Sequence, residues 1–401
     1  MWQNIEAAPA DSILGLTDAF KKDQNPQKVN LGVGVYKDEN SNTPVLEVVK
    51  IAERILLEKE SSKSYLPISG DPGYTREVQK LLFGTSSEVV LSGRAATVHA
   101  PGGTGALRVG GDLLKKFYPT AKVWISSPTW ANHKGVFKTA GFQLAEYAYY
   151  DSETRFLDFD AMVASLKSVP AGDVVLLHAC CHNPSGVDLS DSQWKEVAAL
   201  GKEKGWIPFL DFAYQGFGDG VEEDRCAVAE FAATGIDFLV ASSFSKNFGL
   251  YNERVGALTI ICRFAVEAEV AMSHLKATIR VIYSNPPAHG GLVVATILAD
   301  ADLHRQWLKE LSAMRERIKA MRVALVEGLS KRGVAGDFSY ITTQRGMFSF
   351  SGLNDKVVGW LRANKSIYVV GGGRINLAGL TSANIDYVCD AIAEILNDTN
   401  F

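Results

Sequence analysis

Short runs of almost uninterrupted apolar residues in the middle of the chain constrain its fold most strongly. Strands buried on both faces of a sheet have this composition, whereas strands with one face in water alternate apolar and polar residues. Helical patterns such as Ser192–Lys204 separate several of the runs. We therefore predict βαβ units that build a mostly parallel sheet covered by helices. The runs are Lys122–Ser126, Asp173–His178, Trp206–Asp211, Phe238–Ser242 and Gly256–Ile261.

A different pattern begins near residue 303. Leu303–Lys331 is rich in Arg, Glu, Met and Leu and repeats its apolar residues with the period of a helix, so it predicts one long helix. Beyond it, Met347–Phe350 and Ile367–Val370 are strand candidates around a further helix. Because 401 residues exceed what one hydrophobic core usually serves, we predict a second, smaller α/β domain with its boundary in or near the long helix.

Composition and charge limit which binding partners and which cellular compartment we expect for this chain. The net charge of -4 gives no electrostatic reason to expect nucleic acid or an anionic membrane. The five cysteines are odd in number, and Cys180 and Cys181 are adjacent, which argues against a disulfide framework and favours a reducing cytosol. The start of the sequence lacks the basic and apolar regions of a signal peptide, and no apolar run is long enough to span a bilayer. We therefore expect a cytoplasmic protein.

Polar residues gather where the predicted strands end. They are Ser127, His178–Asn183, Asp211 and Ser243–Lys246. Ligands of open α/β sheets bind outside the carboxyl ends of the strands. This edge is therefore the predicted site, and the prediction depends on no family resemblance.

Lys246 is the residue at this edge with the most specific chemistry. A lysine that follows a buried strand is poorly placed for a solvated charge, and burial lowers the pKa of an ammonium group. A neutral lysine amine is the nucleophile of Schiff-base chemistry. Ser243, Ser245 and Arg254 could hold an anion such as phosphate beside it. The alternative is an ordinary loop lysine with serines that serve turn formation.

The other candidates each have a structural alternative. The Gly102–Gly105 turn could present backbone N–H groups to an anion at a helix start, or could be only a tight turn. Asp211 could pair with a protonated pyridine nitrogen, or could cap a helix. Trp130 could stack on a flat cofactor, or could belong to the core. Asn183, in a turn sequence, could donate a hydrogen bond to a ring oxygen.

Two arginines could bind carboxylates through paired hydrogen bonds. Arg374 follows a triple-glycine segment, and Arg280 precedes Tyr283-Ser-Asn-Pro-Pro287. Each alone could be structural, but two such residues suit a substrate with two carboxylates. Cys180, Cys181, His178 and His182 suggest a metal at first, but adjacent zinc ligands are geometrically awkward. We therefore predict no metal.

The order and spacing of these segments resemble the class I aspartate aminotransferases of pyridoxal-phosphate fold type I, in the bacterial aspartate/aromatic branch. The resemblance covers nearly the whole chain. Its most specific block is Ser243-Phe-Ser245-Lys246, followed by Gly249-Leu-Tyr251 and then Arg254. Other dense blocks are Asn30–Asp38, the Gly103 turn, Cys181–Gly186, Asp211–Gly216 and Tyr283–Gly290.

The resemblance implies an architecture and an assembly. It implies a large domain, residues 46–313, with a mostly parallel seven-stranded sheet flanked by helices and bearing pyridoxal 5'-phosphate. A smaller α/β domain combines residues 13–45 with 314–401, and residues 1–12 form an arm that contacts the other subunit. The expected assembly is a homodimer whose active sites are shared across the interface, with amino acids and 2-oxo acids as its small-molecule partners.

The resemblance also implies residue roles. Lys246 bears the cofactor and moves a proton, Asp211 keeps the pyridine nitrogen protonated with support from His133, and Tyr214 bonds the ring 3-oxygen. The implied cofactor-binding residues are Tyr65 (of the neighbouring subunit), Gly103, Thr104, Trp130, Asn183, Asp211, Tyr214, Ser243, Ser245, Lys246 and Arg254. The implied substrate-binding residues are Gly34, Trp130, Asn183, Arg280 (of the neighbouring subunit) and Arg374.

The implied reaction is ping-pong transfer of an amino group from L-aspartate to 2-oxoglutarate. Val35, Lys37, Thr43, Thr104 and Asn285 are residues of the aspartate type. Departures from the family pattern are Ser64, the segment Pro67-Ile68-Ser69, Gly110, Gly111 and Gly372. These departures leave aromatic amino acids as alternative substrates. An idle binding protein of the same fold and a cofactor-free aldolase that uses Lys246 are further alternatives, but neither explains the full residue set.

Overall fold

The computed structural model describes residues 2–6 and 12–398, and the chain divides into two compact units. The central unit is Pro44–Glu316, and the terminal unit joins Met1–Thr43 to Arg317–Phe401. The division falls inside one long helix, α12 (Ala301–Lys331). Of the expected N-terminal arm, residues 1 and 7–11 lie outside the described residues.

The central unit, all of which is described, contains a seven-stranded sheet with the order β2-β8-β7-β6-β5-β3-β4. Strand β8 runs antiparallel to both of its neighbours, and the other neighbouring strands of the sheet pair in parallel. The strands are β2 (Ala95–Pro101), β3 (Lys122–Ser127), β4 (Gln143–Ala148), β5 (Val174–His178), β6 (Ile207–Phe212), β7 (Phe238–Ser243) and β8 (Val255–Ile261).

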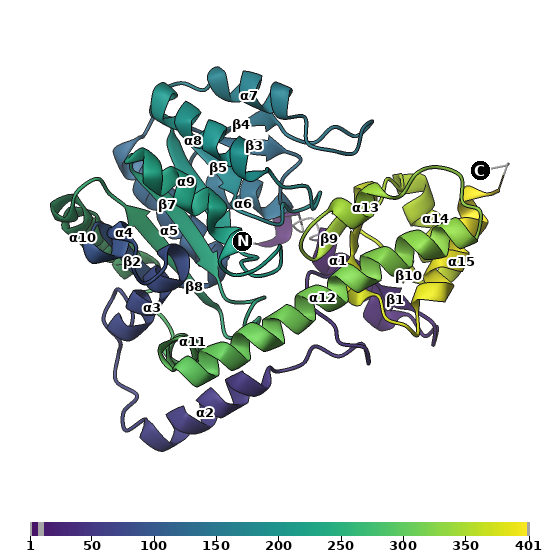
Figure 1. Ribbon diagram of the computed structural model, residues 1–401, viewed down its shortest axis with the longest axis horizontal. Coiled ribbons are helices and arrows are strands. Elements are labelled where there is room, and N and C mark those ends of the chain that lie inside the picture. Colours follow the sequence, from purple (N-terminus) through teal and green to yellow (C-terminus); the bar gives the residue numbers. More distant parts are fainter. Residues whose placement is uncertain (1, 7–11, 399–401) are drawn as a thin grey trace. The chain divides into compact units, whose positions relative to one another are not determined.

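Helices cover both faces of this sheet, and the alternation of side chains along β7 separates the two faces. Leu239 and Ala241 belong to a hydrophobic core shared with helices α5 (Gly102–Phe117), α6 (Ala131–Thr139) and α10 (Ala265–Ile282). Phe238, one residue out of phase, places its ring 5.9 Å from Phe231 of helix α9 (Cys226–Thr234). Helices α8 (Asp191–Lys204) and α9 lie on that second face, in front of the sheet in Figure 1. The predicted covered sheet is therefore confirmed.

The helices of the central unit connect these strands and continue beyond β8. They are α2 (Glu47–Lys59), α3 (Pro72–Phe83), α4 (Glu88–Leu91), α5 (Gly102–Phe117), α6 (Ala131–Thr139), α7 (Phe159–Lys167), α8 (Asp191–Lys204), the 3-10 helix η2 (Glu223–Arg225), α9 (Cys226–Thr234), α10 (Ala265–Ile282) and α11 (His289–Ala299).

Each apolar run of the sequence corresponds to a strand, and the long helical pattern corresponds to α12. The run that became β8 is the one whose direction differs from the expected βαβ pattern. It follows β7 through a loop without a crossover helix, so it can return only antiparallel.

Gly110 has a packing role that its sequence context did not reveal. A Cβ atom at this position of α5 would lie 2.5 Å from the Phe209 ring of β6. The helix therefore approaches the sheet more closely than any larger residue permits. Gly372, another departure from the family pattern, adopts a φ of 73°, where glycine is favoured.

The terminal unit is a smaller α/β layer. Strands β1 (Val29–Asn30) and β10 (Ile367–Tyr368) pair in parallel, and β9 (Phe348–Phe350) pairs antiparallel with β11 (Arg374–Asn376). The buried Arg322 of α12 donates to the backbone carbonyls of Ile341, Gly346 and Phe348 and thereby fixes the segment before β9. The remaining elements are η1 (Trp2–Asn4), α1 (Ser12–Lys22), α13 (Tyr340–Thr343), α14 (Asp355–Lys365), η3 (Gly371–Gly373), η4 (Leu377–Gly379) and α15 (Ile385–Leu396).

No helix in residues 2–6 or 12–398 combines the length and apolar character that a membrane crossing requires.

Candidate active site

Asp211 lies at the carboxyl end of β6 in a buried hydrogen-bonded chain. The carboxylate Oδ2 is 2.9 Å from Nε2 of His133, and Nδ1 of His133 is 2.8 Å from the Thr129 hydroxyl. The strand continues to Phe212 and then turns without forming a helix, so Asp211 caps no helix. This excludes the capping alternative.

Three neighbours keep the buried Asp211 carboxyl ionised. Burial by itself raises the pKa of Asp211. The hydrogen bond and charge of His133 oppose this effect, and so do the charges of His178 and Lys246. Because these interactions outweigh burial, the pKa of Asp211 falls below its ordinary value. The site therefore holds a fixed negative charge next to a lysine.

Lys246 follows β7 and presents its amine toward Asp211 and Tyr214. Although part of the side chain is exposed, burial of the amine lowers the pKa of Lys246. The Asp211 charge raises that pKa and the Arg254 charge lowers it. Lys246 Nζ lies 4.8 Å from the centroid of the Tyr214 ring. The uncharged amine is thus favoured relative to a lysine in water, as the sequence predicted.

The loop that carries Lys246 is fixed on both sides of the lysine. Asn247 donates from its side chain to the Gln215 carbonyl at 3.1 Å, and its own carbonyl accepts from Nε1 of Trp307 at 2.8 Å. The Phe248 ring stacks on Trp307 with centroids 4.5 Å apart. These buried contacts hold the amine in place without using the lysine side chain itself.

A cradle for an anion forms where the Gly102–Gly103 start of α5 meets the Lys246 loop. A Cβ at Gly102 would lie 2.4 Å from the Arg254 guanidinium, and one at Gly103 would lie 3.0 Å from Cβ of Ser243. Arg254 adopts a positive φ of 56° and donates to the Ser245 hydroxyl at 3.3 Å. Backbone N–H groups at a helix start, two hydroxyls and a guanidinium converge here. Thr104 occupies the first turn of the same helix.

The remaining candidates of the central unit divide into buried and exposed groups. Asn183 is buried, and the Trp130 ring packs edge-on against His133 at 5.2 Å. Tyr65 is 91% exposed, and Arg280 is exposed near the end of α10, where it bonds to Ser284. The structure therefore does not bring Tyr65 or Arg280 into the buried group of their own chain.

Arg374 and Gly34 belong to the terminal unit and lie close together there. Arg374 is buried, donates to the Gly32 carbonyl at 2.7 Å, and places its guanidinium 4.2 Å from the centroid of the Phe348 ring. A Cβ at Gly34 would lie 2.9 Å from the same ring. The aromatic face and the backbone carbonyl thus orient the guanidinium, which is a requirement for two-pronged carboxylate binding.

The sequence placed His178 at this edge of the sheet but did not place it beside His133. Its ring lies 5.0 Å from that of His133, and burial lowers the pKa of His178 to about 3. Neither ring nitrogen has a hydrogen-bond partner among the described residues. His178 therefore carries a charge only in acid and is an uncharged neighbour of the Asp211–His133 pair at neutral pH. The sequence interpretation also missed the hydrogen bond between Thr129 and His133. The spacing of four residues between them was the signal that could have indicated it.

Two of the cysteines, Cys180 and Cys181, form a separate buried group with Asp224, which the sequence did not single out. Cys180, Cys181 and Asp224 offer ligand atoms within 4.8 Å of one another, and so do His133, His178 and Asp211. Asp224 accepts backbone N–H groups from Gly216 and Gly218 and so stabilises a turn. Burial raises the pKa of the Cys180 thiol well above its ordinary value, which disfavours the thiolate that metals bind.

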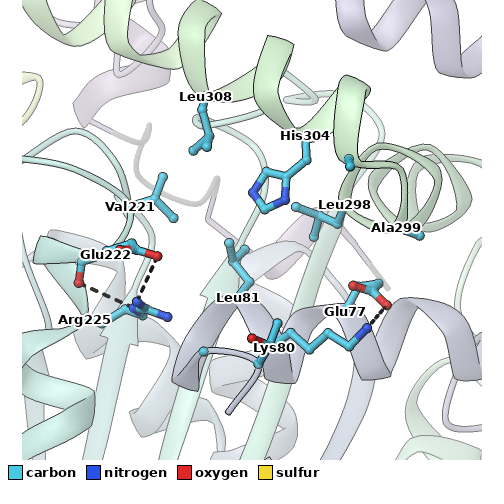
Figure 2. Close-up of a pocket in the computed structure, with 13 residues that line it drawn as sticks. Glu77, Lys80, Leu81, Val221, Glu222, Arg225, Leu298, Ala299, His304 and Leu308 are labelled. Atoms are coloured by element: carbon cyan, nitrogen blue, oxygen red, sulfur yellow. Dashed lines mark hydrogen bonds and ion pairs between the residues drawn. The ribbon is translucent and has the colours of Figure 1, made fainter. Parts of the chain in front are cut away.

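A surface cavity of about 400 Å³ lies elsewhere in the central unit, and none of the candidate residues lines it. Figure 2 shows its ion pairs, Glu77 with Lys80 and Glu222 with Arg225, on either side of an apolar floor that includes Leu81. Because its carboxylates already have cationic partners, this cavity offers no free charge for a ligand.

Comparison with known proteins defines the family. The aminotransferase class I and II family matches residues 26–392. The aspartate aminotransferase of Escherichia coli K12 is 53% identical over 99% of this chain and all of its own length. The aromatic-amino-acid aminotransferase of Pseudomonas aeruginosa is 45% identical over 98% of both chains.

A solved structure of an aminotransferase has the same fold as this chain. The aromatic-amino-acid aminotransferase of Burkholderia pseudomallei, covalently bound to pyridoxal phosphate, superimposes with a TM-score of 0.97. It is 50% identical over 99% of this chain and all of its own. This chain belongs to the class I and II aminotransferase family. The resemblance inferred from the sequence and the expected fold type are therefore confirmed.

The opposing charges around Lys246 predict how its reactivity depends on pH. In cofactor-free protein, Asp211→Asn removes the negative charge that favours the ammonium form, so the pKa of Lys246 should fall further. Arg254→Met removes a positive charge and should raise it. The rate of reductive methylation at Lys246, followed by mass spectrometry across pH, measures both shifts, with the exposed Lys331 as internal reference. Shifts of the opposite sign would contradict the arrangement.

Proposed function

We propose that this enzyme transfers the amino group of L-aspartate to 2-oxoglutarate, giving oxaloacetate and L-glutamate, with pyridoxal 5'-phosphate on Lys246. The observation that carries the proposal is the buried Lys246 amine beside an ionised Asp211 at the carboxyl edge of the sheet. The family membership and the relatives named as aspartate aminotransferases support the same reaction.

The residues present fit this cofactor at each of its polar groups. The Gly102–Gly103 turn, Ser243, Ser245 and Arg254 suit the phosphate. Only glycine lets the turn come this close to Arg254, because a Cβ at Gly102 would collide with the guanidinium. The ionised Asp211 suits a protonated pyridine nitrogen. Thr104 and the partner subunit's Tyr65 complete the proposed phosphate site. Trp130 would stack on the ring, and Asn183 and Tyr214 would bond its 3-oxygen.

The chain's own groups then perform the proton transfers. When bound, pyridoxal phosphate accepts the electrons released as the substrate α-carbon loses its proton. Once the substrate amine has displaced Lys246 from the cofactor, the freed Lys246 amine would take that proton and return it at the neighbouring carbon, acting first as base and then as acid. Asp211, oriented by His133, holds the ring nitrogen in its cationic form. Two half-reactions through one site give ping-pong kinetics.

In the proposed mode of substrate binding, one arginine binds each of the two substrate carboxylates. Arg374 binds the α-carboxylate, and Gly34, Trp130 and Asn183 are the other residues assigned to substrate binding. Arg280 of the neighbouring subunit binds the side-chain carboxylate. Support comes from the exposure of Arg280 and Tyr65, which places both side chains where a second chain could contact them. The proposed assembly is therefore a homodimer, and the proposed location is the cytoplasm.

The domain roles follow from the same assignment. The large cofactor-binding domain is residues 46–313, and the small domain is residues 13–45 with 314–401. Residues 1–12 form the intersubunit arm. Support comes from the concentration of the lysine, the aspartate and the anion cradle within the central unit.

Aromatic amino acids are the second candidate substrates, because relatives named for them are 45% and 50% identical to this chain. Arg280 distinguishes the two candidates, since phenylalanine has no side-chain carboxylate.

The cofactor assignment predicts a spectroscopic result. Protein reconstituted with pyridoxal phosphate should show the near-visible absorption band of a lysine-linked cofactor and lose it when L-aspartate is added. Borohydride should attach the cofactor to Lys246, and Lys246→Ala should abolish both the adduct and transamination. Lys276→Ala, on the exposed side of α10, is the control. An adduct on another lysine would contradict the assignment.

The substrate assignment predicts an unequal effect of Arg280→Ala. With aspartate, kcat/KM should fall by about a hundredfold or more, because the variant leaves a carboxylate without its partner. With phenylalanine the fall should be far smaller. Measuring both specificity constants for Arg280→Ala and Lys276→Ala checks this. Equal losses with both substrates would rule out a carboxylate-binding role for Arg280.

The shared-site assignment predicts complementation between inactive variants. Lys246→Ala and Arg280→Ala subunits should each form poorly active homodimers with aspartate. In a hybrid dimer, one site combines the intact Lys246 of one chain with the intact Arg280 of the other. Mixing the two variants after mild dissociation should therefore restore aspartate activity. If Arg280 acts within its own chain, no site has both residues, and no activity returns.

A further inference from the structure

The buried ring of His182 lies between two segments of the central unit that carry candidate active-site residues. On one side, its Nδ1 is 2.7 Å from the hydroxyl of Ser185, in the turn of residues 182–186 that also carries Asn183. On the other side, its Nε2 is 3.0 Å from the hydroxyl of Ser126, near the end of β3 and four residues before Trp130. The ring is only 1% exposed. It therefore joins this turn to the end of β3 by two hydrogen bonds away from solvent.

The partners of the two hydroxyls determine which ring nitrogen of His182 carries the proton. The Ser185 hydroxyl accepts from the N–H of Val187 at 3.1 Å. In the described part of the chain, the hydrogen of that hydroxyl has no acceptor other than Nδ1 of His182. Nδ1 is therefore the acceptor, and a neutral ring has its proton on Nε2. It follows that Nε2–H donates to the Ser126 hydroxyl.

The same chain of hydrogen bonds continues beyond Ser126 and ends at a backbone carbonyl. Burial raises the pKa of the Tyr147 hydroxyl and a hydrogen bond from Ser126 opposes this effect, so Ser126 is the donor. Tyr147 then donates to the carbonyl of Leu176 on β5 at 2.8 Å. Every hydroxyl in the chain thus both accepts and donates. Networks that are satisfied throughout in this way hold their members in one arrangement.

The surroundings of His182 keep its ring uncharged, which preserves the direction of these bonds. Burial lowers the pKa of His182 well below its ordinary value, and the neighbouring His178 and His133 lower it further. The Pro128 carbonyl acts in the opposite direction but does not outweigh them. The ring also stacks on that of Tyr149, with centroids 4.0 Å apart and planes 17° from parallel. A second ring proton, on Nδ1, would face the hydroxyl hydrogen that this nitrogen now accepts.

The backbone of the turn has anchors of its own next to His182. The N–H groups of Cys181 and His182 donate to the two carboxylate oxygens of Asp188 at 2.7 and 2.8 Å. The N–H of Gly186 donates to the His182 carbonyl at 2.7 Å. These bonds fix the shape of the turn within residues 181–188. The ring of His182 adds a connection from the turn to β3.

We propose that His182 is a positioning residue, whose ring holds the turn against the end of β3 and thereby places the Asn183 amide where it bonds the 3-oxygen of the cofactor. This inference rests on the proposed function, which gives Asn183 that partner. Such a bond stabilises the anionic form of the 3-oxygen, so the oxygen retains the proton of the Lys246–cofactor linkage less strongly. A well-placed Asn183 therefore lowers the pKa of that linkage.

A pH titration of the cofactor absorption band tests this role. His182→Leu removes both ring bonds and should raise the pKa of the Lys246 linkage by about 0.5 to 1 unit, and Asn183→Ala should raise it by about 1 unit or more. Adding His182→Leu to Asn183→Ala should cause no further rise, because the two residues act on one bond. His182→Gln, which keeps a donor for Ser126, should shift the pKa less than His182→Leu.

Two further variants separate positioning from a general loss of stability. Thr259→Val removes the buried hydrogen bond between the Thr97 and Thr259 hydroxyls, 3.0 Å apart, on strands that β7, β6 and β5 separate from β3. It should lower the melting temperature but leave the titration unchanged. Ser185→Ala removes only one partner of the His182 ring and should raise the pKa of the linkage less than His182→Leu. It decides the matter if His182→Leu does not fold.

The direction of the hydrogen bonds can be tested without cofactor. In protein labelled with ¹⁵N-histidine, the ring signals that His182→Gln removes should be those of a neutral ring protonated on Nε2. They should not change between about pH 6 and pH 9, a range in which an ordinary histidine begins to titrate. A proton on Nδ1 would overturn the proposed chain.

Two results of the absorption titration would also overturn the proposal. One is an unchanged pKa in both His182→Leu and Ser185→Ala. The other is a further rise when His182→Leu is added to Asn183→Ala, which would mean that His182 acts through another group. If the unsubstituted enzyme formed no lysine-linked band, the proposed function would itself be refuted. The role of His182 is thus refuted separately whenever that band is present.

Discussion

The site depends on the ionised Asp211 carboxylate at the edge of the central sheet and on its attraction to the positive charges of its neighbours. Burial alone would neutralise both Asp211 and Lys246, but their surroundings treat them differently. His133 keeps the carboxylate charged, while burial and Arg254 favour the uncharged amine. One group is thus available to hold a cationic ring nitrogen and the other to move protons.

The fold supplies this arrangement because neighbouring parallel strands end at the same edge. Strand β6 carries Asp211, and β7 leads into the Lys246 loop. The loop has its own anchors, since Asn247 and Phe248 are held by Trp307. The lysine side chain can therefore change partners during a reaction while its backbone stays in place. The close packing of Gly110 on Phe209 similarly brings α5, and with it the anion cradle, against the sheet.

Much of this could be predicted from the sequence, because buried strands have a distinctive composition and strand ends share an edge. Those two facts located Asp211 and Lys246 before any comparison with relatives. The antiparallel course of β8 was missed, since its run looks like those of its parallel neighbours. The position of His178 beside His133 was also missed, because residues 45 apart in sequence meet only through the sheet. Local sequence equally gave no sign that Gly110 serves close packing.

A crystal structure of the cofactor-loaded enzyme tests the central claim most directly. The account predicts continuous electron density from the Lys246 amine to the cofactor, with the ring nitrogen within hydrogen-bond distance of the Asp211 carboxylate. The phosphate should lie among Gly103, Ser243 and Arg254. A structure in which the amine points into bulk water, or in which the ring nitrogen faces a group other than Asp211, would contradict it.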